Sequence, residues 1–210
     1  MKKISSKCKL CRLEGQKLFL KGTRCSSPKC AMVKKNYKPG FHGPKKQMRR
    51  TSAYGQQLRE KQKTKRIYGL LEKQFSNLIK KALKNKEGAG TFLINQLENR
   101  FDNIVYRLKL APSRNTAKQL IAHNHFQING KKVNISSYVL KIGDKIKVKE
   151  NKALDKYWEN IKKNKNLAKE IPGHLSLDAK KLEAQITGQP NIEDIKKSIN
   201  TSLIIEFYSR

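Results

Sequence analysis

Four cysteines lie within the first thirty residues, and no other cysteine follows along the 210-residue chain. They form two close pairs, Cys8 with Cys11 and Cys25 with Cys30, separated by a short loop. Two such pairs can bring four thiolates to one tetrahedral Zn²⁺ ion, and the lysines and arginines between them would offset its negative charge. Because protein fills all four positions, the predicted ion is structural, with no place for a catalytic water.

Disulfides, free thiols or another metal are the alternatives for these cysteines. A disulfide needs an oxidising compartment, and residues 1–7 offer no apolar signal region before the first cysteine. The four-residue spacer of the second pair is longer than that of the commonest zinc ribbon. The spacing therefore favours zinc without deciding it.

Charge points to the class of partner. The chain has 48 Lys and Arg against 16 Asp and Glu, a formal charge of +32. Residues 1–50 contain 16 basic residues and one acidic residue, Glu14, whereas residues 171–210 contain five of each. So uneven a charge indicates a polyanionic partner, and nucleic acid is favoured. A membrane would need an amphipathic anchor, a lipidation site or a long apolar run, and none is visible, so no membrane partner is expected.

Residues 37–44 contain two glycines and two prolines and are predicted to be non-helical. This segment suits a backbone laid along phosphates with Tyr37 or Phe41 available for stacking, and a plain linker is the alternative. Between residues 51 and 110, apolar residues recur every three or four positions, which predicts amphipathic helices broken at Gly88-Ala-Gly90. Four basic residues are expected to project from the first of these helices towards phosphates: Lys61, Lys63, Lys65 and Arg66.

Residues 100–150 are the best-defined unit. Ser113 is predicted to cap a helix with Arg114 and Lys118 on its edge, and Asn129-Gly130 is the strongest short signal for a hairpin turn. Lys131 and Lys132 are predicted to lead the returning strand of this hairpin, and residues 145–149, which alternate between Lys and apolar residues, are predicted to form a further strand after a turn at Gly143-Asp144. A small α+β module with a basic edge is expected, of a kind that recognises the shape and backbone of structured RNA.

Two less informative segments follow. Residues 151–170 are rich in Lys and Asn and are predicted to be a mobile or helical linker. The last forty residues are nearly neutral and end in a strand-like run from Leu203 to Arg210. Their balance of charge indicates that they pack back on the body of the protein.

Several stretches together resemble the zinc-bearing form of the bacterial ribosomal protein S-four family. They include residues 8–31 with the four cysteines, Tyr37-Lys-Pro-Gly-Phe-His-Gly43, Arg100-Phe-Asp-Asn-Ile-Val-Tyr-Arg107 with the Asn129-Gly130 hairpin, and the ending Ile205-Glu-Phe-Tyr-Ser-Arg210. The likeness spans nearly the whole chain in order. The family's usual opening before Cys8 is missing.

The resemblance implies an α+β fold in four parts. These are a zinc-binding N-terminal segment (1–45), a helical domain (46–99), an inserted S-four-type RNA-binding module (100–165), and a C-terminal segment (166–210) packed on the helical domain. It also implies a structural protein that binds small-subunit, 16S-type rRNA, nucleates assembly of the 5′ domain and, with ribosomal protein S-five, influences translational accuracy. Other small-subunit proteins, and mRNA near the pore where it enters, are further expected partners, and the expected location is the cytoplasmic small subunit, an organellar ribosome being the alternative.

The candidate site residues follow from these expectations. One structural Zn²⁺ is expected on Cys8, Cys11, Cys25 and Cys30. RNA contacts are expected from basic and polar side chains of the first helical region and the small module: Lys45, Lys46, Arg49, Arg50, Lys61, Lys63, Ser113, Arg114, Lys118, Gln119, His123, Lys131 and Lys132.

Three other classes of protein are weighed against this reading. An RNA-modifying enzyme could use the same small module, but it would need a catalytic domain of about 150 residues, for which no segment is large enough. A zinc-finger DNA-binding regulator would place a recognition helix after its ligands, where this chain has a helix-hostile turn. A non-ribosomal RNA-binding regulator would share the charge and the module. No catalytic residue is expected.

Overall fold

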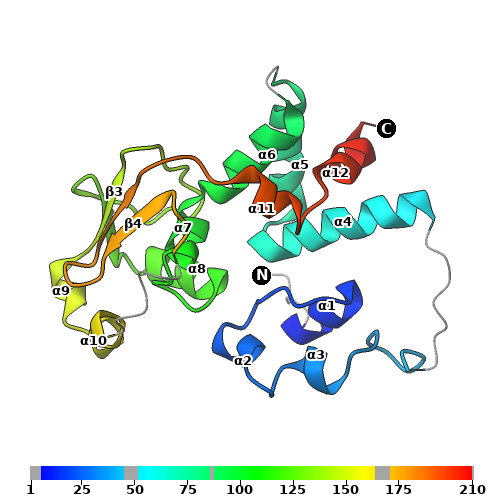
Figure 1. Ribbon diagram of the computed structural model, residues 1–210, viewed down its shortest axis with the longest axis horizontal. Helices are drawn as coiled ribbons and strands as arrows, with labels where there is room; N and C mark the ends of the chain where they lie inside the picture. Colours follow the sequence, from blue (N-terminus) through cyan, green and yellow to red (C-terminus); the bar gives the residue numbers. More distant parts are fainter. Residues whose placement is uncertain (1–5, 45–51, 86–87, 164–170, 210) are drawn as a thin grey trace. The chain divides into compact units, whose positions relative to one another are not determined.

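The computed structural model describes residues 6–44, 52–85, 88–163 and 171–209. They belong to two compact units, each of which is described by itself (Figure 1). The first unit comprises residues 1–93 and 195–210, and the second comprises residues 94–194. The chain passes from the first unit to the second within α6 (Ala89–Glu98) and returns within α11 (Ile192–Lys196).

The cysteine-rich part of the first unit consists of three short helices, α1 (Lys7–Glu14), α2 (Thr23–Ser26) and α3 (Ala31–Lys34). Gly15 ends α1 in the left-handed conformation, where its N–H donates to the carbonyl of Cys11. Residues 37–44 form bends and turns without helix, which confirms the expectation from their glycines and prolines.

Three longer helices complete the first unit: α4 (Ala53–Tyr68), α5 (Glu72–Leu83) and α12 (Thr201–Tyr208). The Ser52 side chain caps α4, and Gly69 ends it with φ of 61°. Phe75 and Ile79 of α5 and Ile204 of α12 are fully buried, and α12 packs against both α4 and α5. The helical region after residue 51 was therefore correctly predicted, with an additional break at Gly69. The break expected at Gly88-Ala-Gly90 is only partly correct, because α6 already includes Ala89 and Gly90.

The strand expected at the C-terminus is wrong, because residues 201–208 form α12. Asn200 caps this helix by accepting a hydrogen bond from the backbone N–H of Leu203 at 3.3 Å. The sequence of the helix contains two isoleucines, which favour strands in isolation. Burial of one helical face, centred on Ile204, outweighs that preference.

The second unit contains a five-stranded antiparallel sheet in the order β2-β1-β3-β5-β4. Its first three strands are β1 (Phe126–Ile128), β2 (Lys131–Lys132) and β3 (Lys145–Val148). Asn129 and Gly130 both have positive φ, 49° and 76°, as a tight hairpin turn requires, so the predicted hairpin is confirmed. Helices α7 (Phe101–Arg107) and α8 (Arg114–Ala122) share one core with the sheet.

The last two strands of this sheet correct the expected domain boundary. β4 (Leu175–Asp178) and β5 (Glu183–Ile186) pair with each other, and β5 pairs with β3. The expectation that residues 166–210 pack on the helical domain is wrong for residues 175–186. Their alternating apolar residues face the core of the second unit, with Ala184 opposite Ile146.

The Lys/Asn-rich stretch is helical where the structure describes it. It forms α9 (Glu150–Ala153) and α10 (Lys156–Lys163), while residues 164–170 lie outside the described residues. Trp158 of α10 is fully buried, with its ring 5.6 Å from that of Phe126, edge to face. Its indole N–H donates to Nδ1 of His125 at 3.2 Å. The hydroxyl of the neighbouring Tyr157 donates to the carbonyl of Leu110 at 2.8 Å, so two aromatic residues make this stretch part of the module.

Candidate nucleic-acid interface

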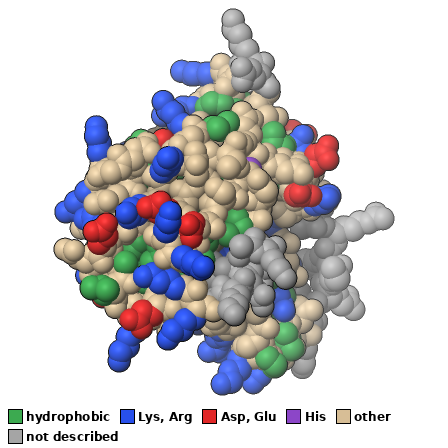
Figure 2. Space-filling view, turned by 60° about the vertical axis from the view of Figure 1, so that its left-hand side comes forward, with side chains coloured by type: hydrophobic (Ala, Val, Ile, Leu, Met, Phe, Trp, Pro, Cys, Tyr) green, Lys and Arg blue, Asp and Glu red, His purple; other side chains and the backbone are tan. Residues whose placement is uncertain are grey.

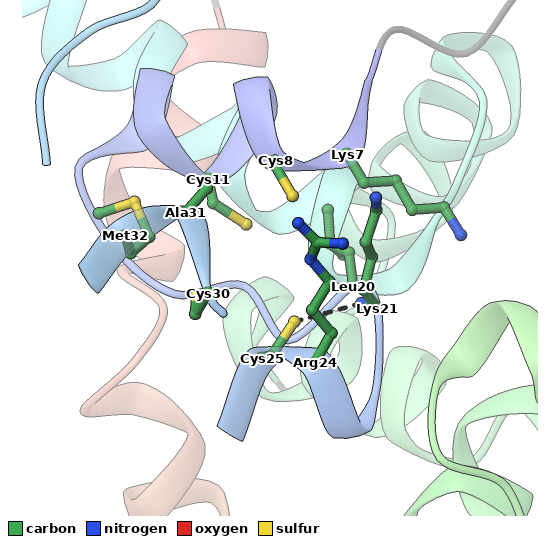
Figure 3. Close-up of a pocket in the computed structure, with 10 residues that line it drawn as sticks. All are labelled: Lys7, Cys8, Cys11, Leu20, Lys21, Arg24, Cys25, Cys30, Ala31 and Met32. Atoms are coloured by element: carbon green, nitrogen blue, oxygen red, sulfur yellow. Dashed lines mark hydrogen bonds between the residues drawn. The ribbon is translucent and has the colours of Figure 1, made fainter. Parts of the chain in front are cut away.

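The four predicted zinc ligands line one small cavity in the first unit (Figure 3). Cys8 and Cys11 extend from α1, Cys25 from α2, and Cys30 precedes α3. The cavity measures about 10 Å³, roughly the space that one water-sized sphere occupies. Lys7, Lys21 and Arg24 also line it. All four cysteines are free thiols, so neither pair forms a disulfide in this structure.

The four thiols line a common cavity, but they are not arranged as the ligands of a metal ion. Among the described residues, no group of three or more His, Cys, Asp or Glu is arranged so that it could hold a metal ion. Cys11, Cys25 and Cys30 are buried, and the backbone N–H of Lys21 donates to Sγ of Cys25 at 3.3 Å. Burial raises the pKa of Cys11, and its nearness to the other three cysteines raises it further. Four neighbouring thiolates would repel one another, and a bound cation would offset their negative charge. The donor set therefore suits Zn²⁺ chemically.

One buried carboxylate joins the cysteine segment to α4. The Glu14 side chain, at the end of α1, is 2% exposed, forms an ion pair with Arg66, and lies 3.6 Å from Nη1 of Arg59. Burial raises the pKa of Glu14, and the two arginines oppose that rise. The sole acidic residue of residues 1–50 therefore has an internal role, while the surrounding basic residues remain as the segment's excess charge.

The basic side chains of α4 lie closer to the protein than the sequence suggested. Lys61 was expected to project into solvent, and this is wrong: the residue is 7% exposed and its Nζ lies 2.8 Å from Oε1 of Glu72. Lys63 pairs with Glu60 at 2.7 Å, with 13% of its side chain exposed. The reason is that the acidic residues of α4 and α5 lie within reach of these lysines.

The predicted RNA-contacting residues of the second unit fall into two sets. Ser113, Arg114 and Lys118 lie at the start and in the first turns of α8 and have partners in the protein. Ser113 accepts from the Thr116 N–H at 3.2 Å, Nε of Arg114 donates to Oδ1 of Asn103 at 2.8 Å, and Nζ of Lys118 lies 3.5 Å from Oδ2 of Asp102. These side chains are held in place by α7 and by the cap of α8.

The second set is exposed. Gln119 lies on α8, His123 directly follows that helix, and Lys131 and Lys132 form β2. Lys132 is opposite Gln127 of β1, the strand that begins three residues after His123. Because the connection from α8 to β1 is short, His123 and the β2 lysines belong to the same module. All three side chains are exposed and could contact a polyanion.

The aromatic residues of the turn segment differ in exposure. The guanidinium of Arg12 lies over the ring of Tyr37, 4.5 Å from its centroid, and its Nε donates to the Tyr37 carbonyl at 2.8 Å. Phe41 is 95% exposed. Tyr37 is 38% exposed, so of the two rings expected to be available for stacking Phe41 is the more accessible. The basic residues that follow, Lys45, Lys46, Arg49 and Arg50, lie outside the described residues.

Sequence reasoning missed the acidic residues that organise the second unit. Glu98 and Asp102 are 2% and 1% exposed, and Asn103 is fully buried. Asp102 accepts two hydrogen bonds from Arg100, at 3.1 and 3.0 Å. The available signal was the position of these polar residues inside an otherwise apolar helical pattern, where a charge requires a partner.

Lys and Arg side chains are scattered over the face shown in Figure 2, with Asp and Glu gathered in few places. No helix of the described residues has the length and apolar composition needed to cross a membrane. The arrangement offers basic side chains held by buried acids on one unit, and a strongly basic cysteine segment on the other.

Comparison with known proteins gives consistent matches along the chain. Residues 2–98 match the family model "Ribosomal protein S4/S9 N-terminal domain", and residues 100–146 match the model "S4 domain". A "Small ribosomal subunit protein uS4" of Clostridioides difficile is 48% identical, over 97% of this chain and 96% of that protein. Proteins of the same name from Caldicellulosiruptor saccharolyticus (100% and 99% covered) and Thermus thermophilus (99% and 98% covered) are 47% and 45% identical.

Proposed function

The chain belongs to the ribosomal S4 family, and we propose that it binds 16S-type rRNA through both of its units and helps to nucleate assembly of the 5′ domain. As a member of this family it is a structural, rRNA-binding protein of the small ribosomal subunit and not an enzyme. The observation that carries the proposal is the pair of family matches that together cover the cysteine segment, the helices and the module.

In the second unit, the proposed rRNA surface is the α8 surface, defined as Arg114, Lys118, Gln119 and His123, together with Lys131 and Lys132 of β2. Exposed lysines act as point charges on phosphates, whereas a fixed arginine can donate a planar pair of hydrogen bonds. Such a surface recognises the shape of a folded RNA, because its contacts are spaced by protein structure and not by base sequence.

In the first unit, the proposed metal is one structural Zn²⁺ held by Cys8, Cys11, Cys25 and Cys30. The shared cavity, the free thiols and the basic residues around them support this proposal. When bound, zinc would tie three short helices together and fix the shape that the segment presents to RNA. The protein's own residues supply the positive surface, with Lys7, Lys21 and Arg24 lining the cavity.

Contacts with ribosomal protein S-five, and with mRNA near the pore through which it enters, are finer proposals that rest on family membership. Through the first of these the protein would influence translational accuracy. Cross-linking of the assembled small subunit, followed by identification of the linked chains, tests both contacts.

The rRNA proposal is tested with the full chain and a magnesium-folded transcript of the 5′ domain. Binding should weaken steeply with salt, and the unfolded strand should compete poorly. Replacing Lys131 and Lys132 with alanine should lower affinity and reduce the log–log salt slope by up to about two units. The matched control replaces Lys162 and Lys163, two exposed lysines of α10, and should have a smaller effect. Equal losses from the two pairs would contradict a privileged surface on the module.

A further inference from the structure

The buried amide of Asn103 has a fixed orientation in the second unit. Its Nδ2 donates to Oε2 of Glu98 at 2.7 Å and to the Glu98 backbone carbonyl at 2.9 Å. Its Oδ1 accepts from Nε of Arg114 at 2.8 Å. Because both amide ends have partners of the correct polarity, the side chain cannot flip without losing all three bonds.

The carboxylate that holds Asn103 is itself fixed. Nε and Nη2 of Arg107 donate to the two carboxylate oxygens of Glu98 at 3.0 and 2.9 Å. This bidentate pair is the geometry in which arginine and carboxylate interact most strongly, and the Glu98 side chain is 1% exposed. The chain of contacts therefore runs from Arg107 through Glu98 and Asn103 to Arg114.

A second contact restrains the Arg114 guanidinium. Its Cζ lies 4.5 Å from the centroid of the Tyr106 ring, within the range of a cation–π interaction. The ring of Tyr106 on one side and the Asn103 amide at Nε together restrict the rotation of the side chain. An arginine on a protein surface otherwise has many accessible rotamers, which it loses when it binds.

Arg114 is the first residue of α8, next to the cap Ser113. Helix N-termini favour anions, and a guanidinium held there adds a full positive charge. Four residues outside the proposed rRNA surface thus determine the orientation of Arg114: Glu98 at the end of α6, and Asn103, Tyr106 and Arg107 of α7.

We propose that Asn103 is a positioning residue for rRNA binding: it holds the Arg114 guanidinium, stacked on Tyr106, in the orientation that meets a phosphate of the folded rRNA. Glu98 acts one step further back, by fixing Asn103. This inference rests on the proposed binding of rRNA by the α8 surface. Pre-orienting one such side chain should be worth about a three- to tenfold gain in affinity.

The test is a double-mutant cycle in the full chain, with the magnesium-folded 5′-domain transcript as probe. Arg114→Ala should weaken binding about tenfold or more and reduce the salt slope by about one unit. Asn103→Ala should weaken binding about three- to tenfold with little change of slope, because the charge of Arg114 remains. In the Arg114→Ala background, Asn103→Ala should have no further effect on affinity.

Two further variants separate positioning from a general loss of structure. Tyr106→Phe keeps the ring beneath Arg114 and should retain affinity, whereas Tyr106→Leu removes the ring and should weaken binding as Asn103→Ala does. Asn151→Ala, an exposed asparagine of α9, is the matched control and should change nothing. Thermal unfolding followed by circular dichroism identifies any variant whose fold is lost. If Asn103→Ala does not fold, the comparison of Tyr106→Phe with Tyr106→Leu tests the positioning of Arg114 instead.

The outcomes are distinguishable. If Asn103→Ala weakens binding equally with and without Arg114, or if Tyr106→Leu leaves affinity unchanged, the positioning role is contradicted while rRNA binding stands. If Arg114→Ala itself leaves affinity and salt slope unchanged, the proposed α8 surface is contradicted, and the positioning role with it.

Discussion

Nζ of Lys61 lies 2.8 Å from Oε1 of Glu72 and 4.5 Å from the centroid of the Phe207 ring. These contacts join α4, α5 and α12, three helices of which the last is distant in sequence from the other two. A lysine that the sequence assigned to phosphate binding thus stabilises the first unit from within.

Replacing Lys61 with methionine should therefore lower the free energy of unfolding by about 1–2 kcal/mol, because a charge-assisted hydrogen bond and a cation–π contact are lost. The salt dependence of rRNA binding should stay unchanged. The control is Lys80→Met at an exposed position of α5, which should alter stability by less than about 0.5 kcal/mol. A reduced salt slope at unchanged stability would contradict this internal role.

Glu72 gives the first unit a defined pH dependence. Its partial burial opposes ionisation, but hydrogen bonds from Lys61, Lys65 and Tyr208 outweigh that effect and lower its pKa from 4.5 to about 2. The resulting stabilisation is complete above pH 4.5, the value for the unfolded chain, and is lost as the pH falls towards 2.

Urea unfolding of the protein and of Glu72→Gln across this range checks the effect. The stability difference between the two should be constant above about pH 5.5 and should shrink by more than half at about pH 3. An unchanged difference at the acid end of this range would show that the hydrogen bonds of Glu72 do not favour its ionised form.

Trp158 should be the residue that holds α10 to the module. Its replacement with alanine should lower the free energy of unfolding of the second unit by about 3–5 kcal/mol, through the cavity left beside Phe126. Leu154→Ala, at a residue that is 78% exposed, is the control and should have little effect. Circular dichroism during denaturation measures both, and similar stabilities would place Trp158 outside the core.

The proposed zinc site makes a separable prediction. Elemental analysis should find about one zinc per chain, and Cys11→Ser should lower that content and increase proteolysis within residues 6–44. Trp158 is the chain's sole tryptophan and belongs to the second unit, so its fluorescence transition should remain unchanged. Two disulfides, or no metal after anaerobic preparation, would overturn the proposal.

Helix caps, tight turns and amphipathic helices could be predicted from the sequence, because each depends on residues that are close together in the chain. The Ser113 cap and the Asn129-Gly130 turn are as predicted, because a cap needs one side-chain oxygen and the turn needs two residues that tolerate positive φ. The helices after residue 51 follow from their apolar period.

Interactions distant in sequence account for what was missed. α12 is helical because α4 and α5 offer it an apolar surface, and residues 175–186 join the sheet because β3 has an edge for β5. In the candidate site, the sequence contains Arg114 and Asn103 eleven residues apart, but no periodic pattern indicates that their side chains meet. Buried polar pairs are visible only once the helices are packed.

Sedimentation of a lysate from the source organism through a sucrose gradient tests the central claim most directly. The protein should migrate with the small ribosomal subunit at low salt and remain there after purification of the subunit. A protein that stays at the top of the gradient, away from rRNA, would contradict the assignment of this chain as a structural component of the small subunit.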